Sequence, residues 1–288
     1  MRIIDCHAHT FPERIAAAAL ETLSGNSHTR PFTDGTEEGL RRAIARAGVD
    51  RAVILPVATS PRQVVKVNDA SILINRHTEE TGLLSFGCIH PDFPDWHAEL
   101  GRIAAAGLRG VKLHPVYQHV PVDDPRCVRI LARASELGLA VTIHAGIDIG
   151  FPGSGEASVE RLDRAIRQAG EGTYILAHMG GWRQWEAAAD LLAGRGLYID
   201  TAFSLGRLSP GGDGFPWTED ALQMMTPEAF VRQARAFGTD HVLFGTDSPW
   251  ADEAQSVAEF LALPFTAEER EAILHRNAER LLGLAPAQ

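Results

Sequence analysis

The sequence predicts a single (β/α)₈ barrel, a TIM barrel, that spans residues 1–288. Short β-branched runs recur along the whole chain, and a stretch with helical periodicity follows each of them. Most of the runs are apolar throughout, as strands covered on both faces must be. Eight units in 288 residues fit one closed barrel, and no break in composition marks an interdomain linker. The expected strands are residues 2–6, 52–57, 83–89, 110–113, 140–143, 174–177, 197–200 and 241–244.

Several of the intervening helices begin at recognisable signals. Residues 60–61 and 124–125 each place a capping side chain before a proline at the first helical position. Thr266 and Glu269 form the pattern of a capping box. An open, doubly wound sheet is the alternative architecture, although no GxGxxG motif follows the first strand. Three long connections predict walls or lids of a site: residues 24–35, 145–157 and 204–218.

Composition narrows the classes of partner. The net charge is −10 and no run of Lys or Arg occurs, so the chain would repel nucleic acids and anionic membranes. No apolar run is long enough to cross a bilayer, and the first residues read as a strand rather than a signal peptide. The three cysteines lie in apolar segments and predict buried thiols without disulfides. We expect a cytoplasmic protein with a small-molecule substrate, as a monomer or a homo-oligomer.

Histidines gather where the expected strands end. In a barrel, the groups that carry chemistry lie at the carboxyl ends of the strands. His7 and His9 are two residues apart, so both imidazoles point to the same side of their strand. Imidazoles from separate segments, together with a carboxylate such as Asp247 after the last strand, suit Zn²⁺ or a similar divalent ion. The histidines at expected strand ends are His7, His9, His90, His114, His144 and His178.

This series of motifs resembles the amidohydrolase superfamily. HxH at the first strand, His at the fifth, His at the sixth and Asp at the eighth are typical of the branch that contains aminocarboxymuconate-semialdehyde decarboxylase. The segment 277–283, NAERLLG, is similar to the closing motif of that branch. The resemblance implies that His7, His9, His144 and Asp247 ligate a metal ion, with one ion expected. It also implies that His178 lies beside the reacting water or the substrate.

The chemistry of these residue types agrees with those roles. A divalent ion lowers the pKa of a water molecule bound to it, and a carboxylate beside that water can shuttle its proton. Asp247 can serve as this base, and His178 can polarise a carbonyl or carboxylate of the substrate. Imidazole and carboxylate ligands accept Zn, Mn, Fe and Co, so the sequence leaves the identity of the metal open.

Lys112, at the end of the fourth strand, has three interpretations. Binuclear members of the superfamily use a carboxylated lysine at this strand to bridge two metals, and Lys112 could occupy that place. It could instead bind a substrate carboxylate or form a buried ion pair. Binuclear phosphoesterases of the TatD kind carry a glutamate here, which makes them a weaker match.

Further residues near the strand ends are candidates for contact with the substrate. His114 and His90 could line the rim of the site or could anchor loops through hydrogen bonds. The aromatic residues Tyr117, Trp182 and Phe203, like Trp250, could line a pocket or could pack in the core.

The sequence favours a metal-dependent hydrolase that attacks an amide, ester or lactone carbonyl of a small organic substrate with metal-activated water. The main alternative is a non-oxidative decarboxylase or hydratase that acts on a carboxylated substrate, because the same ligands serve both reactions. An inactive metal-binding scaffold is disfavoured, since all the residues that would handle the water are present.

Overall fold

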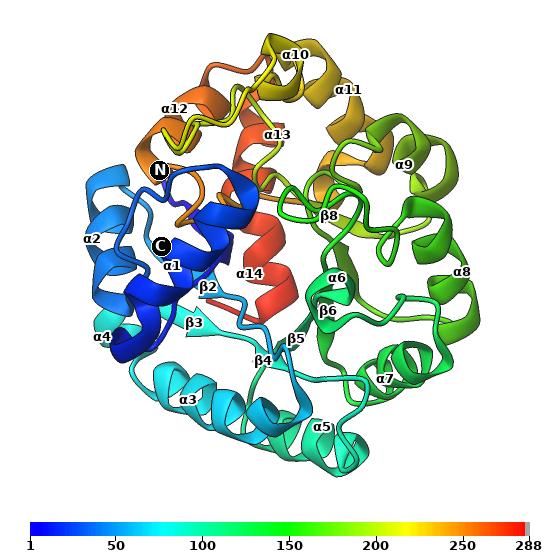
Figure 1. Ribbon diagram of the computed structural model, residues 1–288. Helices are drawn as coiled ribbons and strands as arrows, with labels where there is room; N and C mark the ends of the chain where they lie inside the picture. Colours follow the sequence, from blue (N-terminus) through cyan, green and yellow to red (C-terminus); the bar gives the residue numbers. More distant parts are fainter. Residues whose placement is uncertain (286–288) are drawn as a thin grey trace.

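The computed structural model describes residues 1–285 and has the predicted (β/α)₈ barrel architecture (Figure 1). Every pairing between neighbouring strands is parallel, and the neighbours follow the order of the chain. The strands are β1 Ile4–Ala8, β2 Arg51–Ile54, β3 Leu83–Ser85, β4 Gly87–Cys88, β5 Gly110–Leu113, β6 Ala140–Ile143, β7 Tyr174–Leu176, β8 Tyr198–Asp200 and β9 Val242–Leu243.

The third expected strand, residues 83–89, is divided at Phe86. Its first part, β3, pairs with β2, whereas its second part, β4, pairs with β5. The ring of Phe86 packs in the barrel interior, and a Cβ atom on Gly110 would lie 2.4 Å from it. Gly110 therefore makes room for the aromatic ring at the point where the strand bends.

The barrel closes where β9 and its extension meet β1. The Cys6 N–H donates to the Phe244 carbonyl at 2.8 Å, and the Asp247 N–H donates to the His7 carbonyl at 2.7 Å. The His9 N–H continues this pattern to the Ser248 carbonyl at 2.6 Å. Closure therefore brings the segment after the last strand beside the HxH segment of the first.

Most of the longer helices form a ring around the strands (Figure 1). Short 3₁₀ turns occur at η1 Pro61–Gln63 and η2 Thr239–His241, and η3 Ala272–Arg276 is a π-helical turn. The α-helices are α1 Glu13–Ser27, α2 Glu37–Ala47, α3 Val64–Arg76, α4 Thr78–Thr81, α5 Trp96–Ala105, α6 Pro115–Gln118, α7 Pro125–Glu136, α8 Val159–Ala169, α9 Trp185–Leu192, α10 Glu219–Leu222, α11 Pro227–Phe237, α12 Glu253–Leu261, α13 Ala267–Glu271 and α14 Asn277–Leu282.

Most local sequence signals act as predicted. A capping box forms at Thr266 with Glu269, and the Asp124 side chain caps α7. At η1 the Gln63 side chain accepts the Ser60 N–H at 3.0 Å, but the Ser60 hydroxyl has no partner among the residues that the structure describes. His241 is an exception, because it lies in the 3₁₀ turn η2 and the strand begins only at Val242.

Two apolar clusters hold the barrel together. The larger one fills the space between the strands and the outer helices. The smaller one lies inside the barrel, where Ile4, Val53 and Leu243 pack against Ala278 and Leu282 of α14. In Figure 1, α14 lies within the ring of outer helices. This helix covers the amino-terminal end of the barrel, so the carboxyl end is free to hold a site.

Two further expectations concern the whole chain. Cys6, Cys88 and Cys127 are buried free thiols, as predicted. In residues 1–285, no helix has the length and apolar character needed to cross a bilayer.

Candidate metal centre

A β-bulge in β1 includes His7, the first histidine of the HxH motif. The register between β1 and β2 shifts between Asp5 and Ala8. Cys6 packs in the interior cluster, yet His7 and His9 both line the cavity at the carboxyl end of the barrel. Their Nε2 atoms lie 3.2 Å apart. The two imidazoles therefore meet, as the spacing of the motif predicts.

Hydrogen bonds fix which ring nitrogen of each histidine is free. His7 Nδ1 lies 2.8 Å from a carboxylate oxygen of Asp200, and His9 Nδ1 lies 2.8 Å from the carbonyl of Leu55. Both partners are acceptors, so each Nδ1 carries the proton and each Nε2 presents a lone pair. Burial, aided by the charge of Lys112, holds the pKa of His7 well below its usual range. His7 is therefore a neutral imidazole.

Asp247 completes a group of three acceptors. Its Oδ1 lies 3.4 Å from His7 Nε2 and 3.1 Å from His9 Nε2. Burial raises the pKa of Asp247, whereas positive charge at the imidazoles, His7 foremost, or at an ion between them would lower it. Two lone pairs and one carboxylate oxygen thus face one another. Metal–ligand distances of about 2.0–2.2 Å produce ligand–ligand separations of this size, so these residues fit a divalent ion.

Two buried carboxylates hold these residues in place. Asp200 accepts a hydrogen bond from the backbone N–H of His178 at 2.9 Å while its second oxygen contacts His7. Asp5 accepts from the Thr246 hydroxyl at 2.5 Å and from the backbone N–H of His7 at 2.9 Å. The contacts of Asp200 with His7 and of Asp5 with Thr246 connect segments that are distant in sequence, so they set the relative positions of the candidate ligands.

His144 and His178 lie on the opposite wall of the site. His178 Nδ1 donates to the carbonyl of Ala202 at 3.0 Å, so its Nε2 accepts from His144 Nδ1 at 3.2 Å. His144 Nε2 is buried and has no hydrogen-bond partner. Burial lowers the pKa of both imidazoles. A buried, neutral nitrogen without a partner is the kind of atom that a ligand or an ion completes.

The structure groups His144 differently from the set that the resemblance implies. His7, His9 and Asp247 converge as one potential metal-binding group, whereas His144 belongs to a second group with His114 and Asp148. The rings of His114 and His144 are stacked, with centroids 4.2 Å apart, and their Nε2 atoms lie 3.6 and 3.7 Å from Asp148 Oδ2. Three of the four implied ligands are therefore together, and the ligand role of His144 stays a prediction.

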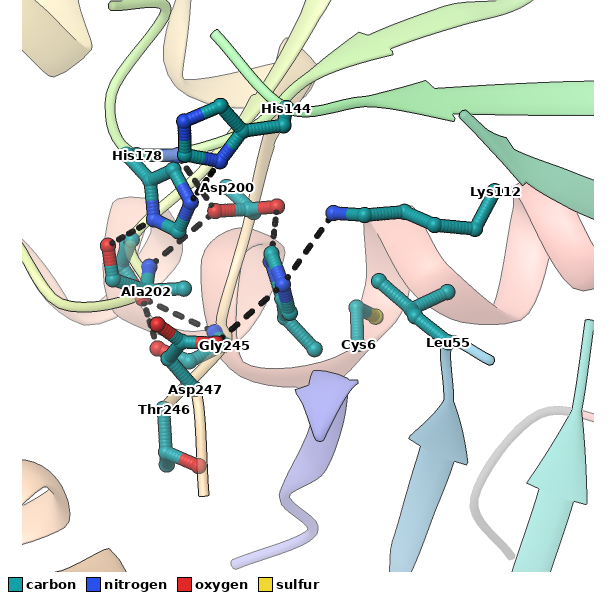
Figure 2. A network of polar contacts seen from close by, with 12 residues as sticks. Cys6, Leu55, Lys112, His144, His178, Asp200, Ala202, Gly245, Thr246 and Asp247 are labelled. Atoms are coloured by element: carbon teal, nitrogen blue, oxygen red, sulfur yellow. Dashed lines mark hydrogen bonds and ion pairs between the residues drawn. The ribbon is translucent and has the colours of Figure 1, made fainter. Parts of the chain in front are cut away.

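Lys112 points into the same centre. Figure 2 shows its side chain extending toward the group that contains His144, Asp200 and Asp247. Its Nζ lies 3.3 Å from His7 Nε2. Burial lowers the pKa of Lys112 to about 8, although nearby carboxylates, Asp200 foremost, oppose this shift. No carboxylate of residues 1–285 lies within ion-pair distance of Nζ, so the interpretation as a simple buried ion pair is not supported.

Three residues around the centre have left-handed backbone conformations. The φ angles are +59° at His178, +70° at Asp247 and +49° at Phe203. Residues other than glycine rarely adopt this backbone region, and such strain is concentrated at functional sites. Next to them, a Cβ atom on Gly146 would lie 2.3 Å from the backbone nitrogen of Trp182, which explains the glycine there.

A cavity of about 920 Å³ connects this centre to the surface. Such a volume suits a small organic molecule. Trp250 also lines it. The residues singled out in the sequence that line the cavity are His7, His9, Lys112, His114, Tyr117, His144, His178, Trp182, Phe203 and Asp247.

His90 is the candidate that the structure keeps apart. It is buried, does not line the cavity, and its Nδ1 accepts the backbone N–H of Asp92 at 3.1 Å. His90 thus anchors a loop through this hydrogen bond, and a position at the rim of the substrate site stays a prediction. The chain bends at Phe86, between β3 and β4, before it reaches His90. The alternation of side chains along β3 therefore does not predict where the His90 side chain points.

Two carboxylates of the site were not predicted from the sequence. Asp200 is the last residue of β8, and its position at a strand end was a usable signal. Asp148 lies in a loop four residues after His144, where nothing in the sequence marks it. Burial raises the pKa of Asp148 to about 6.

Comparison with known proteins identifies the family. A family model described as amidohydrolase matches residues 4–284. The chain belongs to the amidohydrolase family. The resemblance drawn from the strand-end motifs is therefore confirmed, and this amidohydrolase belongs to a family of enzymes. No curated protein matches the sequence significantly.

Solved structures share the fold of this amidohydrolase at low identity. An uncharacterized TIM-barrel protein from Bordetella bronchiseptica has a TM-score of 0.73 at 20% identity, with 99% of each chain covered. A protein assigned as a 2-pyrone-4,6-dicarboxylic acid hydrolase from Pseudomonas putida has a TM-score of 0.65 at 20% identity, with 99% of this chain and 98% of that chain covered. A mutant 5-carboxyvanillate decarboxylase from Novosphingobium aromaticivorans, with bound manganese, has a TM-score of 0.68 at 15% identity, with 98% and 97% covered.

Proposed function

We propose that this amidohydrolase is a metal-dependent hydrolase of a small organic substrate with an amide, ester or lactone carbonyl. The observation that carries the proposal is the meeting of three acceptor atoms, His7 Nε2, His9 Nε2 and Asp247 Oδ1, within 3.4 Å of one another. Neutral lone pairs and a carboxylate oxygen repel one another at this separation unless a cation lies between them. A divalent ion bound there would supply Lewis-acid activation of a water molecule and of the substrate carbonyl.

The residues of the chain divide the remaining work. Asp247 lies beside both imidazoles, where a bound cation would keep its carboxylate ionised and able to accept a proton. Lys112 presents a cation to a substrate carboxylate or to a developing negative charge. The aromatic rings of Tyr117, Trp182 and Phe203 line the cavity and would orient the body of the substrate.

Charge balance supports one ion rather than two. Three buried carboxylates, Asp148, Asp200 and Asp247, act on Lys112 through their charge. One ammonium group and one divalent ion would neutralise them. A carboxylated Lys112 would instead add negative charge and favour a second ion. We propose one ion, Zn²⁺ or another divalent metal such as the manganese in the decarboxylase structure.

Decarboxylation is the second candidate, and Asp148 favours it. Protonation of carbon requires an acid, and an ionised Asp247 is a poor donor. Asp148 lies across the site beside His114, and its pKa of about 6 lets it carry a proton in part of the molecules near neutral pH. Asp148 is therefore suited to donate the proton in the non-oxidative decarboxylase or hydratase alternative.

Product analysis separates the two reactions. The metal-loaded enzyme should hydrolyse at least one member of a panel of lactones, esters and amides and incorporate one oxygen atom from ¹⁸O-water into the product. A decarboxylase would release CO₂ from a carboxylated panel and place solvent deuterium on the vacated carbon. Release of CO₂ with deuterium incorporation, and no activity on the hydrolysable panel, would overturn hydrolysis in favour of decarboxylation.

The contact between Asp200 and His7 predicts a weaker metal site when it is altered. The Asp200 carboxylate orients the His7 imidazole and increases its basicity. Asp200→Asn removes this charge, so the affinity of the site for the metal ion should fall by about 10- to 100-fold. Titration of the metal-free protein with Zn²⁺ or Mn²⁺ measures this change. Asp190→Asn, on the exposed side of α9, is the matched control and should leave the affinity unchanged. An unchanged affinity in Asp200→Asn would contradict the orienting role.

A further inference from the structure

The cavity that holds the candidate metal ligands also carries three cations at its exposed end. Arg14 comes from α1, Arg62 from η1 and Lys66 from α3, and all three line the cavity. Each side chain is exposed, whereas His7 and Lys112 at the inner end are buried. The cavity thus runs from a buried polar centre to a cationic mouth.

What distinguishes these three cations is that they line one cavity and that none of them has an acidic partner among the described residues. Within residues 1–285, none of them forms an ion pair or a side-chain hydrogen bond. Many other arginines are paired closely, as for Arg102 with Glu99 at 2.7 Å and Arg161 with Asp123 at 2.6 Å. The chain has 37 acidic and 27 basic residues, so acidic partners are abundant.

The mouth keeps an excess of positive charge. Glu37, at the start of α2, is an acidic residue that lines the same cavity, and it too forms no ion pair in the described part of the chain. Three cations stand against this one carboxylate at the exposed end. An anionic group entering there meets attraction that the protein itself does not satisfy.

An apolar wall lies between the two polar ends. α1 and α3 each turn one face toward the cavity, with residues spaced three or four apart as on one side of a helix. The apolar side chains of these faces offer contact to a hydrocarbon or aromatic body, and the hydroxyls of Thr22, Ser27 and Ser71 line the cavity beside them. The apolar residues of this wall include Ile15, Ala19, Leu23, Val67 and Ile74.

We propose that the substrate carries a second carboxylate, remote from the reacting group, which Arg14, Arg62 and Lys66 bind at the mouth. The molecule would place its reacting end at the metal centre, its apolar body along α1 and α3, and its acidic end at the three cations. This inference rests on the proposed function, since it takes the metal centre as the reacting end. Guanidinium and ammonium groups bind carboxylates through charge-assisted hydrogen bonds, which are modest singly at an exposed site and add up in a cluster.

Binding of unreactive acids tests this outer subsite directly. The probes are straight-chain dicarboxylic acids from adipic to sebacic acid, each compared with the monocarboxylic acid of the same length, on the metal-loaded protein. We expect at least one diacid to bind about 10-fold more tightly than its monoacid, and this advantage to shrink as salt rises. In Arg14→Gln/Arg62→Gln/Lys66→Gln the advantage should disappear while the affinity for monoacids stays the same.

A matched triple variant controls for the loss of positive charge. Arg76, Arg109 and Arg232 are exposed, form no ion pair in residues 1–285 and lie outside the cavity. Their replacement by Gln should preserve the diacid advantage. Equal binding of diacids and monoacids at every length, or equal losses for both in the mouth variant, would overturn the outer subsite alone. Failure of both series to bind would contradict the metal centre as the reacting end and, with it, the proposed function.

Discussion

Replacement of both His7 and His9 by alanine should remove the bound divalent ion and abolish turnover. The two Nε2 atoms and Asp247 Oδ1 are the three converging atoms that can ligate a metal ion. The double variant keeps only Asp247 Oδ1. A site that loses two nitrogen ligands cannot retain the ion at physiological concentrations. Metal analysis of the purified protein measures the outcome, and the wild type should carry one equivalent.

The double variant His77→Ala/His97→Ala is the control for this experiment. Both histidines are exposed, on or beside helices away from the cavity, so the variant should keep the full metal content. Retention of a full equivalent in His7→Ala/His9→Ala would refute the ligand assignment. Two equivalents in the wild type would instead refute the single-ion proposal and point to Lys112 as a bridge.

The sequence predicts most of the architecture because the barrel depends on periodic features. The alternation of strands and helices can be recognised from short stretches of sequence. Eight consecutive βα units are the number that closes a parallel sheet into this barrel. The meeting of His7 with Asp247 could be predicted for the same reason, since the last strand of a closed barrel lies beside the first. Hydrogen bonds between these two segments confirm that closure.

Side-chain directions at the edge of the barrel could not be predicted equally well. His144 follows a regular strand, but its ring stacks on His114 and its Nε2 approaches Asp148, a loop residue that periodicity cannot place. His90 follows a bent strand and turns into a loop contact. Loop conformation therefore decides which strand-end residues enter the site and which support it.

The outer part of the cavity could not be predicted from the residues at the strand ends either. Its walls come from α1 and α3, which approach each other only in the folded barrel. Arg14 and Lys66 are ordinary exposed helix residues in the sequence. Their common cavity and their lack of acidic partners become evident only in three dimensions.

Asp247→Asn should separate metal binding from proton transfer. Asparagine has nearly the same size and keeps one carbonyl oxygen toward His7 and His9, so a large part of the metal should remain. The amide cannot accept the proton that the carboxylate takes, and turnover should fall by about 10²-fold or more, the usual scale for the loss of general acid–base catalysis. Metal content and rate are measured on the same preparation, with Asp190→Asn as the control that should change neither.

The outcome of Asp247→Asn also distinguishes the two carboxylates that face the site. A metal-loaded variant that keeps the wild-type rate would show that Asp247 is not the base. The proton would then have to move through another group, and Asp148 is the remaining carboxylate that lines the cavity near the centre. Asp148→Asn would in that case produce the large loss of rate that we expect from Asp247→Asn. If instead Asp247→Asn loses the rate and Asp148→Asn keeps it, the proton passes through the carboxylate beside His7 and His9, as hydrolysis by an ionised base requires.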